Sequence, residues 1–329
     1  MSSGRTSVVV SKNEADHFEY PFSASCHPMV DAAERRTLQW VRRLRLAPDE
    51  RALWRIKAAS VAHLAGWVFP SANVQVLQVA SDFTAVLFLL DDAYDEGSLS
   101  ADPQGVARLN EKYLGELFGY VQPDMDDPLT RGLLDIRDRI REGNPHFFLN
   151  RWLSHFQYYY EANLWEANNR RRGRVPRLEE YVMMRRYSGA VYPYCDLMEL
   201  QLDQPLPLEV VQHPLLRSVR EICNDILCWT NDYFSLEKEL RSGEVHNLIV
   251  VLRDSDGVTL EEATARLRRM HDQRVSDYQD VKDRVLSLWP TDGIRQYLDA
   301  TDAMIAGHQR WAIAALRYAE VPGVAAHAG

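Results

Sequence analysis

The chain has 329 residues, of which 46% are hydrophobic, which is typical of one large domain with a substantial core. Its formal net charge of −9 gives no basic footprint for nucleic acid. The one dense basic run, Arg170 to Arg174, is short enough to be a solvated connection between helices. Because no linker, repeat or low-complexity tract divides the chain, we expect a flexible segment at 1–18, one domain at 19–321 and a flexible tail at 322–329.

The sequence gives no sign of a membrane anchor or of a cysteine-based metal site. The first ten residues lack a long apolar core with a cleavage signal, and the longest apolar run, about Phe83 to Leu90, is too short to span a bilayer. These features favour a cytoplasmic protein without stable membrane insertion. The four cysteines lack paired metal spacing and are expected to be reduced, mostly buried thiols: Cys26, Cys195, Cys223 and Cys228.

Apolar residues recur every three or four positions along the chain, which is the period of a helix rather than of a strand. Proline breakers, for example Pro70, Pro123 and Pro176, separate the periodic stretches. The expected helical stretches are, in chain order, 32–46, 83–90, 106–120, 133–141, 147–165, 178–200, 215–240, 260–288 and 293–318. We predict an all-α protein with about ten helices, packed as a bundle whose interior is lined with aromatic side chains.

An acidic motif, Asp91-Asp-Ala-Tyr-Asp-Glu96, follows the apolar stretch that begins at Phe83. Asp91 and Asp95 share one helical face, and a second acidic pair, Asp92 with Glu96, is rotated from the first. Like charges at this spacing repel one another and also oppose the helix dipole at its C-terminus, unless a cation lies between them. The motif therefore predicts metal binding, with an exposed acidic helix end as the structural alternative.

A second motif places Asn231, Ser235 and Glu239 at four-residue steps. In a helix each step rotates by only about 40°, so the three side chains stay on one slowly drifting stripe about 12 Å long. Glu239 can reach back along this stripe because helical side chains lean toward the N-terminus. The donors are all oxygen atoms, which suits Mg²⁺ or Mn²⁺ and argues against zinc. An ordinary polar helix face is the alternative explanation.

Taken together, the two motifs resemble the aspartate-rich motif and the Asn/Ser/Glu motif of class I terpene synthases, in particular the single-domain bacterial terpene cyclases. The resemblance covers about residues 20–320. Further matching positions follow in order: Asn169, Arg170, Gly173, Pro176, Tyr181, Arg185, Arg186, Ser188, Gly189, His246, Asn247, Leu248, Gly307, Trp311, Arg317 and Tyr318. The resemblance implies the class I terpenoid synthase fold, a single-domain helical bundle with a central active-site cavity. It also implies a carbon–oxygen lyase that ionises and cyclises a linear isoprenyl diphosphate.

The resemblance further implies three Mg²⁺ ions, with Mn²⁺ as a substitute. Their expected ligands are Asp91 and Asp95 for two ions, and Asn231, Ser235 and Glu239 for the third. The expected hydrogen-bond donors to the diphosphate are Arg185, Lys238, Arg317 and Tyr318. Ser188 and Gly189 are expected at a helix break, as a linker and a carbonyl-donating effector. Asp92 is expected to support the site by pairing with Arg317 when the site closes, although Asp92 and Asp95 could exchange roles.

A carbocation must be kept from water, and the rings of an enclosed aromatic cavity attract it by about 0.5–2 kcal/mol each. Leu87 and Phe88 precede Asp91 by four and three residues, so we expect both to line a pocket on its helical face. Trp311, shortly before Arg317, is a further candidate for the pocket wall. For all three side chains, plain core packing is the alternative.

The most favoured substrate is the C15 compound farnesyl diphosphate, and the C20 compound geranylgeranyl diphosphate is the alternative. A chain-elongating prenyl transferase is disfavoured because the Asn231 motif stands where a second aspartate-rich motif is expected. His271-Asp272 suggests a metal-dependent phosphohydrolase, but without an upstream histidine cluster this dipeptide is expected to be a surface pair. A non-catalytic helical protein that binds an isoprenoid is the remaining alternative. The sequence leaves the product and a homodimer open.

Overall fold

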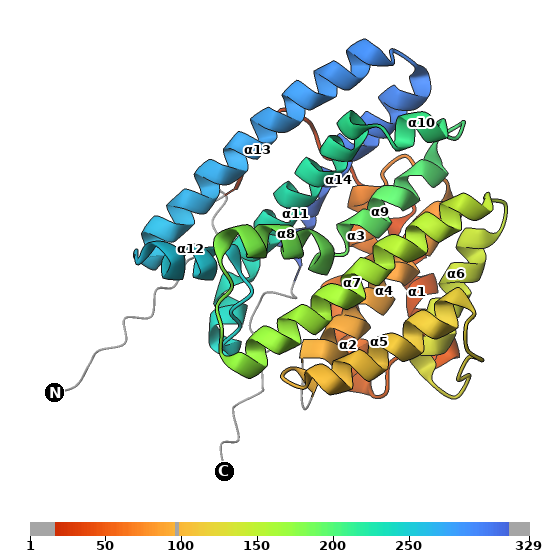
Figure 1. Cartoon of the computed structure of the whole chain (residues 1–329). Coiled ribbons are helices and arrows are strands. Elements are labelled where there is room, and N and C mark those ends of the chain that lie inside the picture. Colours follow the sequence, from red (N-terminus) through yellow and green to blue (C-terminus); the bar gives the residue numbers. More distant parts are fainter. Residues whose placement is uncertain (1–16, 96–98, 316–329) are drawn as a thin grey trace.

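The computed structural model describes residues 17–95 and 99–315, and these residues form helices and no strand (Figure 1). The helices of the first half are α1 (Val30–Leu44), α2 (Glu50–Ala59), α3 (Val61–Val68), α4 (Val74–Asp95), α5 (Pro103–Phe118), α6 (Pro128–Arg141) and α7 (His146–Arg172). Those of the second half are α8 (Leu178–Ser188), α9 (Val191–Leu197), the 3₁₀ helix η3 (Met198–Gln201), α10 (Leu208–Val211), α11 (Pro214–Ser242), α12 (Leu248–Asp256), α13 (Leu260–Leu288) and α14 (Asp292–Ala314). The all-α prediction is confirmed.

The long helices match the expected ranges closely because their apolar period persists over many turns. For α13 the expected and observed bounds are identical, and a capping box between Thr259 and Glu262 fixes its start. The number of about ten helices was too low, since the described residues form fourteen α-helices. The unexpected ones, α2, α3, α10 and α12, have four to ten residues, too few to give a clear period. The stretch 178–200 is also interrupted, at residues 189–190.

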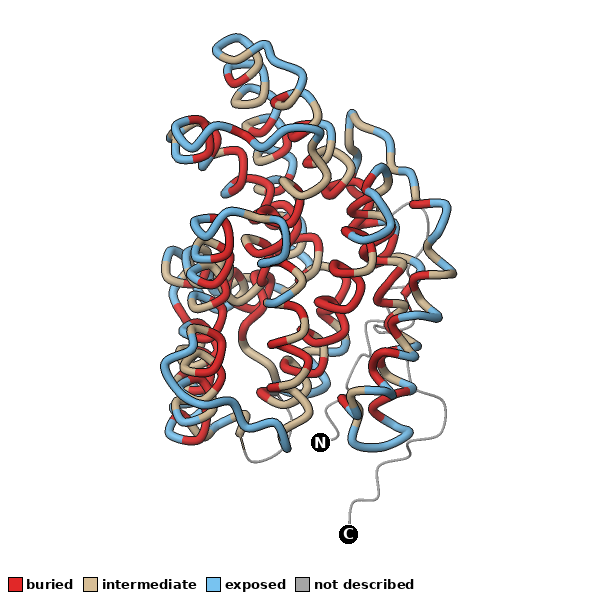
Figure 2. The backbone as a smooth tube through the Cα atoms, turned by 90° about the vertical axis from the view of Figure 1, so that its right-hand side faces the viewer, coloured by how far each residue is buried: buried red, intermediate tan, exposed pale blue. Residues whose placement is uncertain are grey.

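Helix α4 packs against α1, α2, α3, α6 and α9 inside the bundle (Figure 1). Figure 2 shows that the buried residues gather on the inner sides of the helices, and the exposed residues on the outside. By length and composition α4 could cross a membrane, but 72% of its most apolar window is buried inside the protein. Its carboxylate Asp82 is buried and accepts hydrogen bonds from Thr37 of α1 at 2.7 Å and Arg139 of α6 at 2.8 Å. These contacts fix the helix whose last turns carry the acidic motif.

The first described residues are already packed. Phe18 is 4% exposed, stacks on His271 with ring centroids 3.7 Å apart, and exchanges two hydrogen bonds with the side chain of Gln309. The packed domain therefore includes at least Phe18, one residue before the expected boundary. The remainder of the expected flexible segments, 1–16 and 322–329, lies outside the described residues.

Helices α14 and α3 approach closely at Gly307. A Cβ atom on Gly307 would lie 2.2 Å from the backbone oxygen of Trp67, and backbone atoms cannot move aside as a flexible side chain does. Only glycine therefore fits at this crossing, which also sets the position of the α14 face that includes Trp311.

We predict that Gly307→Ala lowers the free energy of unfolding by about 1–3 kcal/mol, the usual cost of overpacking a tight contact. The matched control is Gly293→Ala on the same helix, because a Cβ there would meet only Leu206 Cδ2 at 3.6 Å. Since alanine favours helices over glycine, the control should be neutral or slightly stabilising. Urea unfolding of the two variants and the wild type measures both effects, and equal stabilities would contradict the close approach.

Candidate functional site

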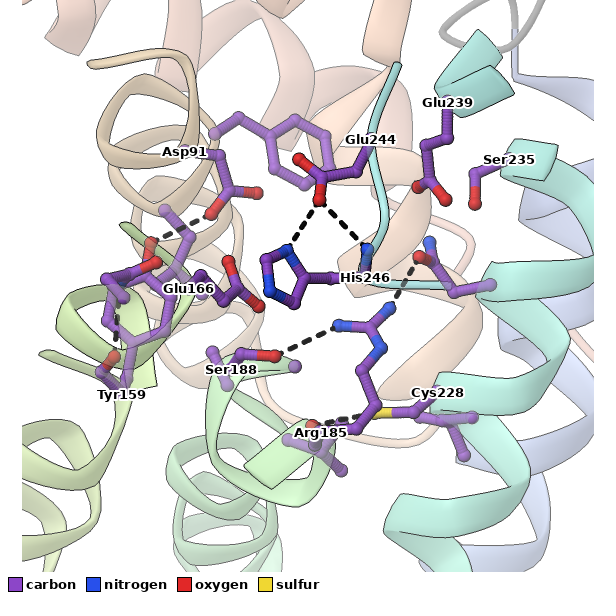
Figure 3. Close-up of a pocket in the computed structure, with 18 of the residues that line it drawn as sticks. Asp91, Tyr159, Glu166, Arg185, Ser188, Cys228, Ser235, Glu239, Glu244 and His246 are labelled. Carbon is purple, nitrogen blue, oxygen red and sulfur yellow. Dashed lines mark hydrogen bonds and ion pairs between the residues drawn. The ribbon is translucent and has the colours of Figure 1, made fainter. Parts of the chain in front are cut away.

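A cavity of about 570 Å³ lies among α3, α4, α7, α8, α9, α11 and α14, and residues 242–246 also line it (Figure 3). Its wall contains apolar side chains, including Leu64 and Val68 of α3, together with several carboxylates. Figure 3 shows Asp91 on one side of the cavity, and Ser235 with Glu239 on the other. The structure therefore brings the two sequence motifs to one cavity, although 140 residues separate Asp91 from Asn231.

Asp91 of α4 lines the cavity and is oriented by a residue that the sequence did not point to. The hydroxyl of Tyr159, on α7, donates a hydrogen bond to Asp91 Oδ1 at 2.8 Å. Burial, together with the charge of Asp91, raises the pKa of Tyr159 well above its usual value, so this hydroxyl remains a donor. Asp92 also lines the cavity and pairs with Arg55 of α2, with Nη1 3.1 Å from Oδ2. The Asp95 side chain lies outside what the structure describes.

Asn231, Ser235 and Glu239 all line the cavity, as their spacing on one helical stripe predicts. The carboxylate of Glu239 accepts a hydrogen bond from Asn247 Nδ2 at 2.8 Å. Desolvation by the surrounding protein, and then the negative charge of Asp232, raise the pKa of Glu239 to about 7. Ser235 Oγ is buried near this carboxylate and lowers its pKa slightly, yet has no hydrogen-bond partner of ordinary geometry.

These oxygen atoms fit a hard divalent cation. Among the described residues no three Asp, Glu, His or Cys side chains cluster as a metal site. The α11 set instead joins one carboxylate to an amide oxygen and a hydroxyl, a combination suited to Mg²⁺. A cation between Ser235 and Glu239 would give the buried Ser235 hydroxyl a partner. It would also stabilise the charged form of Glu239, whose pKa is raised in its absence.

Arg185 of α8 reaches the same wall of the cavity. Its Nε and Nη2 lie 3.0 and 2.9 Å from Asp232 Oδ1, and Nη2 also donates to Asn231 Oδ1 at 2.9 Å. Its Nη1 lies 3.5 Å from Ser188 Oγ. Tyr181 completes the set by donating to Asp232 Oδ2 at 2.7 Å. The guanidinium is thus held at the cavity by a buried carboxylate that does not itself line it.

The helix break expected near Ser188 is present. Helix α8 ends at Ser188, and Ala190 has φ 52°, a left-handed conformation that a residue with a Cβ adopts at some cost. A Cβ on Gly189 would lie 2.3 Å from Cys228 Sγ and 3.2 Å from the backbone oxygen of Arg185, so a larger residue here would require the Cys228 side chain to move. As a result, the chain from Ser188 to Val191 lines the cavity.

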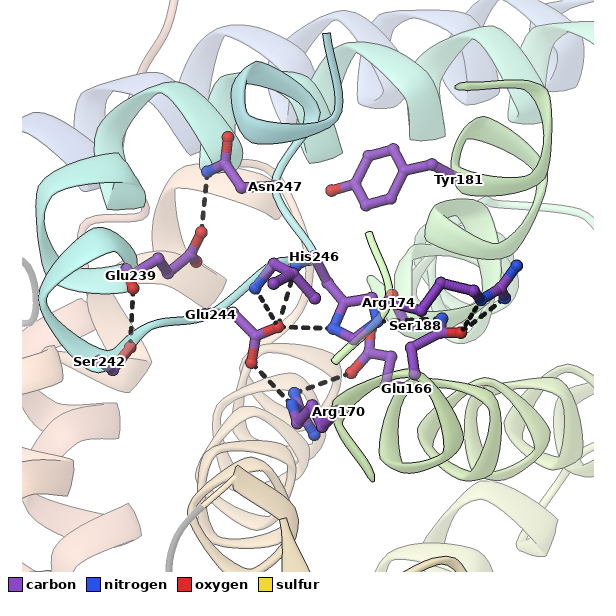
Figure 4. A network of polar contacts seen from close by, with 12 residues as sticks. Glu166, Arg170, Arg174, Tyr181, Ser188, Glu239, Ser242, Glu244, His246 and Asn247 are labelled. Carbon is purple, nitrogen blue, oxygen red and sulfur yellow. Dashed lines mark hydrogen bonds and ion pairs between the residues drawn. The ribbon is translucent and has the colours of Figure 1, made fainter. Parts of the chain in front are cut away.

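The connection between α11 and α12 is held by a charged network whose residues line the cavity (Figure 4). Glu244 binds Arg170 of α7 at 2.7 Å and lies 2.5 Å from His246 Nδ1, while Arg170 also pairs with Glu166 at 3.3 Å. Burial opposes ionisation of Glu244, but His246 and Arg170 outweigh it and hold its pKa well below its usual value. Arg170 was expected on a solvated connection; its side chain is instead 14% exposed, because these acids surround it.

The three expected pocket side chains, Leu87, Phe88 and Trp311, all line the cavity. The rings of Phe88 and Trp311 are tilted to one another with centroids 6.0 Å apart. Trp311 Nε1 donates to the carbonyl oxygen of Ala59 at 2.8 Å, which fixes the indole against α2. Lys238 lines the cavity as well. The remaining expected diphosphate ligands, Arg317 and Tyr318, lie outside the described residues.

The interpretation of His271-Asp272 as a surface pair was wrong for the histidine. The His271 side chain is fully buried, and its Nε2 lies 3.0 Å from the Tyr20 hydroxyl. Burial lowers its pKa to about 3, so the ring is neutral. Asp272 is exposed, as expected. Phe18 and Tyr20, which pack on His271, precede α1 in the chain, and the apolar period does not reveal such a contact.

Comparisons with known proteins agree with this arrangement. Residues 82–277 match the family model described as terpene synthase family 2, C-terminal metal binding. The (+)-eremophilene synthase of Sorangium cellulosum is 70% identical over the whole of both chains. The (+)-T-muurolol synthase of Roseiflexus castenholzii, named as cyclizing (2E,6E)-farnesyl diphosphate, is 32% identical over 91% of this chain and 92% of its own. Among solved structures, germacradien-4-ol synthase from Streptomyces citricolor has a TM-score of 0.79 at 27% identity, covering 91% of this chain and 99% of its own.

The raised pKa of Glu239 predicts how the metal-free protein responds to pH. The folded state binds a proton at Glu239 more tightly than the unfolded state, so stability falls as pH rises from about 4.5 to 7. Glu239→Gln has no ionisable group at this position and avoids the fall in stability. The free energy of unfolding of the variant, relative to that of the wild type, should therefore rise by about 1–3 kcal/mol across that range. Urea unfolding in a chelator at several pH values measures the difference. Glu237→Gln, two residues away, is the matched control. If the difference in unfolding free energy between Glu239→Gln and the wild type does not change with pH, the raised pKa of Glu239 is contradicted.

Proposed function

Because the chain belongs to the terpene synthase family, we propose that it ionises farnesyl diphosphate and cyclises the resulting allylic cation to a sesquiterpene. The observation that carries this proposal is the cavity itself, in which an apolar wall with aromatic rings lies next to oxygen donors from α4 and α11. Two relatives whose names specify farnesyl diphosphate, (+)-T-muurolol synthase and 4-epi-cubebol synthase, support the C15 substrate. The 70% identity to (+)-eremophilene synthase makes that hydrocarbon the first product to seek.

Ionisation breaks a carbon–oxygen bond while negative charge grows on the departing diphosphate. Arg185 is placed to meet this charge, because Asp232 and Asn231 hold its Nε and Nη2 while Nη1 lies near Ser188 at the cavity wall. A planar guanidinium held in this way offers a diphosphate fixed donors that need no reorganisation during the reaction. Lys238 adds a second cation from α11, and Arg317 with Tyr318 complete the set of donors by resemblance.

The metal ions, when bound, supply further positive charge to the departing diphosphate. We assign Asp91 and Asp95 to two Mg²⁺ ions, and Asn231, Ser235 and Glu239 to the third. In support, Tyr159 turns Asp91 into the cavity, and the Ser235 hydroxyl has no regular partner. The number of ions and the use of Mn²⁺ rest on the resemblance, whereas a cytoplasmic location rests on the shortness of the apolar runs.

The carbocation is formed next to the rings that stabilise it. Phe88 lies one helical turn before Asp91, so diphosphate departure near Asp91 leaves the cation close to Phe88 and to the neighbouring Trp311. These aromatic faces attract positive charge, and the apolar side chains around them, such as Leu87 and Val68, exclude the water that would end cyclisation. The roles of Ser188 and Gly189, as a linker and a carbonyl-donating effector, rest on the resemblance and are supported by the helix break, which puts both residues in the cavity wall.

The test of this function is incubation with C10, C15 and C20 allylic diphosphates and Mg²⁺, followed by gas chromatography of the products. We predict a cyclic C15 hydrocarbon from farnesyl diphosphate without added isopentenyl diphosphate, and no product in the presence of a chelator. Asn231→Ala should lower product formation by about 10²-fold or more, because it removes a metal ligand and a partner of Arg185.

Asn168→Ala is the matched control. Within residues 17–95 and 99–315, the Asn168 side chain bonds only to the Leu164 carbonyl of its own helix, at 2.8 Å, and it is absent from the cavity wall, so activity should be unchanged. A product only from the C20 substrate would reassign the chain to diterpene synthesis. Binding of the diphosphates without any turnover would make it an isoprenoid-binding protein, and would contradict the proposal.

A further inference from the structure

His308 introduces a basic nitrogen into the apolar part of the cavity wall. It lies on α14 between Met304 and Trp311, and the spacing of four and three residues puts all three side chains on one helical face that lines the cavity. Its ring is tilted to that of Trp311, with centroids 5.8 Å apart. The same wall is otherwise formed by carbon-rich side chains, with Leu64 and Val68 on α3.

The nitrogen atoms of His308 have no structural task. The residue is 8% exposed, its Nδ1 is buried without a hydrogen-bond partner, and within the part of the chain that the structure describes neither nitrogen makes a hydrogen bond. Leaving a buried polar atom without a partner is energetically costly, so such atoms are rare in native proteins and often mark a functional site. A leucine at this position would line the cavity without that cost.

His308 is also in the protonation state of a base. Burial, and then the positive charge of Arg185, lower the pKa of His308 to about 4. The imidazole is therefore neutral near pH 7, and one of its two nitrogens carries a free lone pair whichever tautomer is present. An imidazole nitrogen is a far stronger base than an alkene, so proton transfer to it from an alkyl cation is strongly favourable even with a lowered pKa.

The other titratable groups in the described cavity wall already have partners. Glu166 and Glu244 bind Arg170, Asp92 binds Arg55, Asp91 accepts from Tyr159, and Glu239 accepts from Asn247. The Tyr194 hydroxyl is bonded to Thr84 Oγ1, and Cys228 Sγ to Asn224 Oδ1. Among these groups His308 alone presents an unengaged basic atom in the described cavity wall.

We propose that His308 is the catalytic base that removes the terminating proton from the final carbocation. The inference rests on the proposed function, since it requires a cation in this cavity. In this step a C–H bond next to the cationic carbon breaks, its electron pair forms the second bond of a new C=C bond, and the proton forms an N–H bond on the imidazole. The imidazolium returns the proton to solvent or to the released diphosphate when the cavity opens, so the step needs no oxidant or reductant.

The test compares the products that wild type, His308→Gln and His308→Leu form from farnesyl diphosphate and Mg²⁺. Both variants should release diphosphate within about threefold of the wild-type rate, because steps other than deprotonation commonly limit turnover. The share of the main wild-type hydrocarbon should fall about tenfold or more, replaced by other alkenes or by alcohols from water capture. His63→Gln makes the same chemical change at a half-exposed surface histidine and should keep the wild-type products.

The outcomes distinguish a failure of the proposed function from a failure of the role proposed for His308. If wild type forms no cyclic product, the proposed function fails. If wild type is active and His308→Gln keeps its main hydrocarbon, His308 is not the base, and the diphosphate or the cavity shape decides where the proton is lost. Nitrogen-15 NMR of the wild type provides a measurement that needs no variant: we expect a neutral His308 ring at pH 7, and an imidazolium there would overturn the proposal.

Discussion

The frame of the cavity depends on one buried carboxylate, Asp232 of α11, which holds three separate elements together. From α8 it accepts hydrogen bonds from Arg185 and Tyr181, and at the start of α12 it accepts one from the backbone N–H of Leu248 at 3.0 Å. Asn247 donates to the backbone carbonyl of the same aspartate at 2.7 Å. A buried carboxylate that loses such partners destabilises a protein by several kcal/mol, so these contacts require one another. They place a charged guanidinium and the oxygen stripe of α11 on one wall.

Much of the site could be predicted because helix geometry is local. Once Asp91 is placed on a helix, Phe88 must lie one turn away on the same face, and the structure puts both at the cavity. In the same way the four-residue steps from Asn231 to Glu239 fix a stripe without knowledge of the rest of the fold. The long helices were predictable for the same reason, since their apolar period repeats over many turns and identifies the buried face.

Contacts between distant segments could not be predicted, because they depend on how the helices pack. The sequence predicts only that aromatic side chains line the bundle, and nothing in it connects Tyr159 to the aspartate that it orients, which lies 68 residues earlier in the chain. The sequence places Arg170 in a basic run that is expected to be solvated. In the structure α7 packs beside the α11–α12 connection, and acidic side chains surround Arg170. The sequence does not indicate a role for His308, since a histidine on an apolar helix face is usually part of the core. Only the structure shows that its Nδ1 is buried without a hydrogen-bond partner. Residues that orient and modulate the site are therefore less visible in the sequence than its ligands.

A crystal structure of the protein with Mn²⁺ and inorganic diphosphate would show whether the two motifs bind metal at one cavity, because anomalous scattering locates each ion without ambiguity. We expect Mn²⁺ bound to the carboxylate of Asp91, and a separate Mn²⁺ bound by Asn231, Ser235 and Glu239. The diphosphate should bridge the two groups and accept hydrogen bonds from Arg185. Diphosphate bound outside this cavity, or an α11 stripe without an ion at saturating Mn²⁺, would contradict this expectation.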